Sequence, residues 1–79
     1  MGVQEAPENG PIDMTAADLS TKALKLLYAG ATQEALDALT EAIQLDPESA
    51  EAYSYRGVAY YQLGDYDSAL EGYDKAIAL

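Results

Sequence analysis

Histidine, cysteine, tryptophan and phenylalanine are absent from this sequence of 79 residues. Histidine is the most common general base of enzymes, and cysteine supplies thiolate nucleophiles, disulfides and zinc ligands. The serines do not lie in a nucleophile motif, and the sequence has no glycine-rich phosphate loop. We therefore expect a protein without enzymatic activity, catalytic residues, cofactor or bound metal ion.

Basic residues and long apolar runs are also scarce. Four Lys and Arg residues stand against fourteen Asp and Glu, which gives a formal net charge of −10. Because phosphate binding requires clustered Lys and Arg, neither nucleic acid nor an anionic membrane surface is an expected partner. No run of roughly 18 apolar residues and no signal-peptide pattern is present. We expect a soluble chain, cytoplasmic by default, whose partner is a protein or peptide.

The first fourteen residues have no regular apolar period. Pro7, Gly10 and Pro11 interrupt the segment, and it offers little apolar surface to bury. We expect residues 1–14 to be a disordered acidic tail, either native or an added leader. The folded domain is then expected over residues 15–79.

The domain repeats itself at a spacing of 34 residues. Aligning residues 16–45 with residues 50–79 gives identical pairs at Ala16/Ala50, Ser20/Ser54, Gly30/Gly64, Ala35/Ala69, Leu36/Leu70, Ala42/Ala76, Ile43/Ile77 and Leu45/Leu79. Most of these residues are small or apolar and therefore govern helix packing. A period of this length indicates a solenoid of stacked supersecondary units, none of which buries its apolar face alone.

Each repeat reads as a helix-turn-helix, with helices predicted near residues 16–29, 33–45, 50–63 and 66–78. Gly30 and Gly64 are expected to end the first helix of each repeat, because glycine readily adopts the left-handed conformation. In the last helix, the predicted inner stripe consists of Ala69, Leu70, Tyr73, Ala76 and Ile77.

Polar residues precede three of these helices. Thr15 with Asp18 resembles a capping box, and Ser49 is a candidate N-cap. The Asp65-Tyr66-Asp67 cluster offers carboxylates, but an EF-hand loop needs further oxygens, a central glycine and a closing glutamate. Capping by Asp65 is the favoured interpretation.

Small residues are expected where the two helices of a hairpin approach each other. Ala23 with Ala35, and Gly57 with Ala69, occupy equivalent places in the two repeats. A glycine inside a helix costs about 1 kcal/mol relative to alanine. We therefore interpret Gly57 as a packing residue at a close helix crossing.

At these residues the chain resembles the tetratricopeptide repeat family. Residues 50–79 hold the residues of the family motif in order: Tyr53, Gly57, Tyr60, Gly64, Ala69, Tyr73 and Ala76. Residues 16–49 match less closely, since Leu19, Ala23, Leu26 and Leu39 replace the first aromatic, the glycine, the tyrosine and the second aromatic. The resemblance implies an all-α fold, an α-solenoid of two right-handed helix-turn-helix repeats, 16–49 and 50–79. The second repeat lacks the closing proline.

In that family, the first helices of successive repeats line a concave groove that binds a peptide of a partner. The resemblance therefore implies a non-catalytic scaffold for protein–protein interaction. The expected groove residues are Leu24, Leu27, Tyr28, Tyr55, Val58, Tyr61 and Gln62. The family's carboxylate clamp is not expected, because Ser20, Leu24 and Tyr55 replace its lysine, asparagine and arginine. Tyrosines and aliphatic residues on an acidic body suit an apolar or basic segment. The alternative for Tyr28, Tyr55 and Tyr61 is ordinary half-buried surface.

Two further functions remain open from the sequence. The last helix has no following repeat to cover its outer flank, formed by Leu70, Tyr73 and Ile77, and such a flank predicts a homodimer or higher homo-oligomer. The other alternative is that the chain is a structural fragment of a longer array of repeats.

Overall fold

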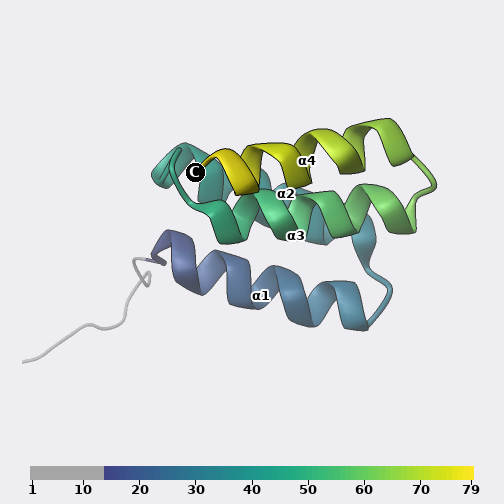
Figure 1. The fold of residues 1–79 in the computed structure, drawn as a ribbon. Helices are drawn as coiled ribbons and strands as arrows, with labels where there is room; N and C mark the ends of the chain where they lie inside the picture. Colours follow the sequence, from purple (N-terminus) through teal and green to yellow (C-terminus); the bar gives the residue numbers. More distant parts are fainter. Residues whose placement is uncertain (1–13) are drawn as a thin grey trace, which may run out of the picture.

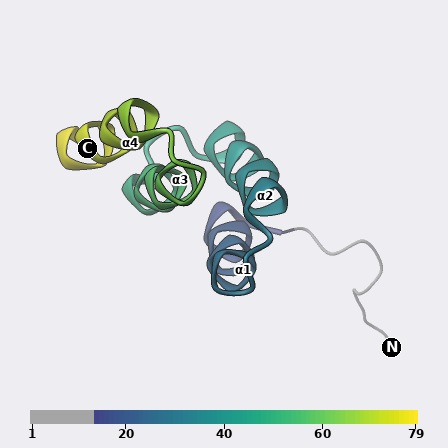
Figure 2. The same ribbon diagram turned by 90° about the vertical axis from the view of Figure 1, so that its right-hand side faces the viewer.

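The computed structural model describes residues 14–79 and contains four α-helices. They are α1 (Ala16–Tyr28), α2 (Thr32–Leu45), α3 (Ala50–Gln62) and α4 (Tyr66–Ala78). Consecutive helices run antiparallel (Figure 1). Viewed along the helices, α3 lies in the centre, with α1 and α2 on one side of it and α4 on the other (Figure 2). The predicted all-α solenoid is confirmed, whereas the predicted tail lies, except for Met14, outside the described residues. None of the described helices is long and apolar enough to cross a membrane.

Side-chain caps begin three of the four helices. Thr15 and Asp18 form a capping box, in which each side chain accepts the other residue's backbone N–H at 3.1 Å. The Ser49 hydroxyl accepts the backbone N–H of the third residue of α3 at 3.2 Å. The Asp65 carboxylate accepts the backbone N–H of Ser68 at 3.2 Å and its hydroxyl at 2.7 Å. Asp65 therefore caps α4, as predicted from the sequence.

The same turn ends α1 and α3. Gly30 has a φ of 80° and Gly64 a φ of 83°, both in the left-handed region. The Gly30 N–H donates to the carbonyl of Leu27 at 3.1 Å, and the Ala31 N–H donates to that of Leu26 at 2.8 Å. The Gly64 turn has the same pair of bonds. This Schellman arrangement satisfies carbonyls that the helix end would leave without partners.

The core is formed mainly by α1, α2 and α3. Its buried members are Leu19, Ala23, Leu27, Ala35, Leu36, Ala38, Leu39, Ala42, Ala52 and Ala59. Ser20 is a polar residue that is fully buried, and its hydroxyl has no hydrogen-bond partner among residues 14–79. Helix α3 packs on α1, α2 and α4, whereas α4 packs on α3 alone among the described helices.

Helices α3 and α4 approach each other most closely at glycines. A Cβ atom placed on Gly57 would lie 2.8 Å from Cε1 of Tyr73 and 3.0 Å from the carbonyl oxygen of Ala69. The sequence had suggested Ala69 as the neighbour of Gly57, and this contact is present. Gly57 has a second neighbour, Gly72, that the sequence did not indicate. A Cβ on Gly72 would lie 3.0 Å from Gly57 Cα.

The predicted inner stripe of α4 needs a correction. Leu70 is 59% exposed and Ile77 is 83% exposed, so neither is packed into its own hairpin. In repeat one the equivalent Leu36 is only 7% exposed. The difference arises because α3 packs on α2, whereas no described helix covers the corresponding side of α4.

Candidate peptide-binding surface

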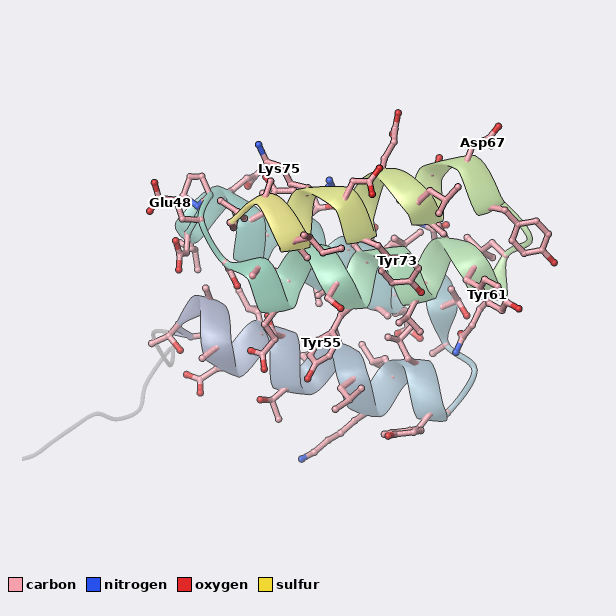
Figure 3. All side chains as sticks on the ribbon, viewed as in Figure 1. Glu48, Tyr55, Tyr61, Asp67, Tyr73 and Lys75 are labelled. Carbon is pink, nitrogen blue, oxygen red and sulfur yellow. The ribbon has the colours of Figure 1, made fainter. Side chains whose placement is uncertain are left out.

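The predicted groove residues lie on α1 and α3, which are neighbours (Figure 2). Tyr28 at the end of α1 is 85% exposed, and Tyr61 near the end of α3 is 60% exposed. Leu24 on α1 and Tyr55 and Val58 on α3 are half-buried. Figure 3 shows Tyr55 projecting from α3 toward α1, with Tyr61 farther along α3. We name Leu24, Tyr28, Tyr55, Val58 and Tyr61 the tyrosine surface.

Tyr55 is the most constrained member of this surface. Its hydroxyl donates a hydrogen bond to the Glu51 carboxylate at 3.3 Å, one helical turn earlier. Burial raises the pKa of Tyr55 above its usual value, and the charge of Glu51, the hydrogen bond to Glu51 and the proximity of Tyr28 raise it further. Tyr55 is therefore a neutral donor at physiological pH, beside a carboxylate that favours a cationic ligand group.

Leu27 and Gln62 were expected in the groove, but neither belongs to the tyrosine surface. Leu27 is only 4% exposed and is a core residue. The amide nitrogen of Gln62 donates to the Leu27 carbonyl at 3.3 Å, and its amide oxygen accepts from the Thr32 hydroxyl at 2.8 Å. Gln62 thus links repeat two to the turn of repeat one, which makes it a structural residue in this arrangement.

Tyr61 also has a neighbour outside the surface. Its ring centroid lies 5.1 Å from that of Tyr66, with an interplanar angle of 51°. This tilted packing holds Tyr61 against the start of α4. Of the three tyrosines expected to contact a ligand, Tyr28 therefore presents the freest ring.

The other tyrosines of the hairpin are half-buried packing residues. Tyr53, Tyr60 and Tyr73 each have intermediate exposure. No group of three or more potential metal-binding side chains is found among residues 14–79. The tyrosine surface presents tyrosine rings and hydroxyls, with the Glu51 carboxylate beside Tyr55.

Comparison with known proteins gives a match over most of the chain. The family profile described as "Tetratricopeptide repeat" matches residues 20–79. The tetratricopeptide repeat and J domain-containing co-chaperone DNJ1 of Fusarium oxysporum f. sp. lycopersici is 35% identical over 74 residues, which is 94% of this chain and 14% of that protein. The chain thus spans about one seventh of this relative's length. It belongs to the tetratricopeptide repeat family, whose members generally mediate protein–protein interaction.

Proposed function

We propose that the chain binds a peptide segment of a partner protein on the tyrosine surface, and that this segment is apolar with at least one basic residue. The observation that carries the proposal is the grouping of exposed Tyr28 with half-buried Tyr55, whose hydroxyl is held by Glu51. Tyrosine provides a large contact area at low cost in side-chain entropy. The Glu51 carboxylate favours a Lys or Arg of the peptide.

The test is direct binding to immobilised peptides that combine leucine or isoleucine with lysine, set beside acidic peptides of the same apolar content. The variant Tyr28→Ala with Tyr55→Ala should lose binding to the basic set and keep its helical circular dichroism. Leu45→Ala is the control, because Leu45 is 57% exposed but lies on α2, away from the tyrosine surface. Equal binding by the wild type and the double variant would refute the proposal.

Self-association is a second candidate function, favoured by the exposed side of α4. We name Leu70, Tyr73 and Ile77 the α4 flank, in which Leu70 and Ile77 are exposed and Tyr73 is half-buried. The proposed occupant is a second copy of the chain, packed flank to flank around a two-fold axis. A head-to-tail stack would instead place α1 on α4, where Asp18 and Lys25 stand at the positions of the fully buried Ala52 and Ala59 of α3. Burying those charges is unfavourable, which favours the symmetric pair.

Sedimentation over a concentration series tests this second function. Because the chain carries a net charge of −10, association should strengthen at high salt. Leu70→Glu should abolish it, whereas Leu45→Glu should not, although Leu45 is exposed to a similar degree, 57% against 59%. A monomer at every concentration and salt level would rule out the pair.

A further inference from the structure

Each repeat has a groove between its two helices, and the two grooves occupy equivalent positions. The repeat-one groove, between α1 and α2, has a volume of about 260 Å³ and is lined by Leu19, Lys22, Leu26, Glu34, Asp37, Ala38 and Glu41. The repeat-two groove, between α3 and α4, has a volume of about 320 Å³ and is lined by Tyr53, Arg56, Tyr60, Ser68, Glu71, Gly72 and Lys75. Every residue of the second set lies 34 positions after its counterpart in the first. The fold therefore forms the same groove twice.

The two grooves differ in charge and in the chemistry of their apolar residues. The repeat-one groove has one base and three acids, with leucines as its apolar residues. The repeat-two groove has two bases and one acid, with tyrosines in place of the leucines. The largest change in charge at one equivalent position is from Glu41 to Lys75. The two grooves are therefore suited to ligands of opposite charge.

Both bases of the repeat-two groove gather on one aromatic ring. The Arg56 Cζ lies 5.2 Å from the ring centroid of Tyr53, and the Lys75 Nζ lies 5.8 Å from it. Cation–π contacts of this kind position a charge without neutralising it. The guanidinium edge and the ammonium group keep hydrogen-bond donors that match a carboxylate. Half of the four basic residues of this acidic chain are held at this one place.

The groove also has the length of a peptide site. Its lining on α4 runs from Ser68 to Lys75, a rise of roughly 10 Å at the helical rise per residue. This length accommodates about three residues of extended chain. Figure 3 places Lys75 on the side of α4 away from α1, whereas Tyr55 projects toward α1. The repeat-two groove is therefore separate from the tyrosine surface.

We propose that the repeat-two groove binds an acidic peptide segment, with a carboxylate between Arg56 and Lys75 beside the ring of Tyr53. The repeat-one groove does not bind such a segment, because three acids line it. This site is distinct from the one proposed for an apolar or basic segment, and it would let one partner be held at two faces through stretches of opposite charge.

The proposal is tested by titrating the ¹⁵N-labelled chain with acetylated, amidated hexaglutamate and following amide and arginine side-chain shifts by NMR. Shifts should concentrate on Tyr53, Arg56 and Gly72. Lys75→Gln should weaken binding about fivefold, as expected for one partly exposed charge pair. Lys25→Gln is the matched control, because it changes the net charge equally but lies outside the groove, and it should leave the affinity within about twofold. Arg56→Gln should also weaken binding, with folding verified by circular dichroism.

A gain-of-binding variant uses the repeat relationship. Glu34→Ser with Glu41→Lys gives the repeat-one groove the polar pattern of repeat two and should produce new hexaglutamate shifts at Leu19, Lys22 and Ala38. The proposal is overturned if hexaglutamate leaves the amides around Tyr53 unmoved, or if Lys25→Gln weakens binding as much as Lys75→Gln. It is also overturned if inorganic phosphate at the same concentration moves these amides as strongly, since the site would then select a lone anion.

Discussion

Gly72 of α4 lies so close to Gly57 of α3 that a methyl group on Gly72 would stand 3.0 Å from both the Cα and the amide nitrogen of Gly57. The same methyl would lie 2.9 Å from the carbonyl oxygen of Tyr53. These are backbone atoms, which cannot rotate away as a side chain can. Repeat one has Ala23 and Ala38 at the equivalent positions, both buried. The second hairpin is thus built on a backbone-to-backbone contact.

Gly72→Ala should destabilise the domain, although alanine is the better helix former. The gain in helix propensity is about 1 kcal/mol, and overpacking against backbone costs about 1–3 kcal/mol, so we expect a net loss of up to about 2 kcal/mol. Asp74→Ala on the exposed side of α4 is the control and should not destabilise. Urea unfolding followed by circular dichroism measures both variants. A Gly72→Ala variant more stable than the wild type would contradict the close contact.

Ser20→Ala should stabilise the domain. The Ser20 hydroxyl is fully buried without a hydrogen-bond partner in the described part of the chain, which costs about 1–3 kcal/mol relative to a satisfied group. Ser54→Ala at the equivalent position of repeat two provides the comparison, because Ser54 is partly exposed and gains the same helix propensity. We expect Ser20→Ala to raise the free energy of unfolding by about 1 kcal/mol more than Ser54→Ala does, as measured by thermal or urea unfolding. Equal effects would show that the Ser20 hydroxyl is satisfied in solution.

The bridge from Gln62 to Thr32 should couple the two repeats. Gln62→Ala removes the bond to the Thr32 hydroxyl and the bond to the Leu27 carbonyl, and it should lower stability by about 1–2 kcal/mol. Thr32→Ala should cost less, and the double variant should fall short of the sum by about 0.5 kcal/mol or more. Unfolding free energies of the four proteins measure the coupling. Strict additivity would mean that the 2.8 Å bond contributes nothing to stability.

Glu51→Gln should lower the pKa of Tyr55, because it removes a negative charge that opposes ionisation of the ring. The value should remain above that of a free tyrosine, since burial is the largest cause of the shift. Folding is therefore favoured by the neutral ring up to the unfolded-state pKa of 10.0, and this contribution is lost as the pH rises through the higher folded-state pKa. Tyrosine ¹³Cζ shifts followed over alkaline pH measure the change. A Tyr55 pKa that Glu51→Gln leaves unchanged would exclude the interaction.

Local chemistry explains why the helices could be predicted from the sequence. The Thr15–Asp18 box and the glycines at 30 and 64 mark helix ends through bonds between residues only a few positions apart. The 34-residue repeat then fixes the order of the helices. The predicted boundaries consequently agree with the observed helices to within one residue.

The burial of individual side chains depended on contacts that the sequence does not encode locally. Leu36 and Leu70 are identical residues at equivalent helix positions, yet only Leu36 lies beneath another described helix. Leu27, expected in the groove, is a buried core residue of α1, a helix that packs on both α2 and α3. The role of Gly72 depends on where two helices cross, which a rotation of either helix would move. The two grooves were likewise missed, because each combines residues from both helices of a hairpin.

Among the described helices, α4 packs on α3 alone, and this determines the order in which we expect the helices to unfold locally. Detaching α4 breaks no contact within repeat one, so its amides should exchange with solvent deuterium first. Detaching α3 would instead expose surface on α1, α2 and α4 together, which makes its central amides the slowest to exchange in repeat two. A ligand that also touches α4 would close this opening and slow exchange there. We therefore expect the protection of α4 amides to report the occupancy of a site that includes α4.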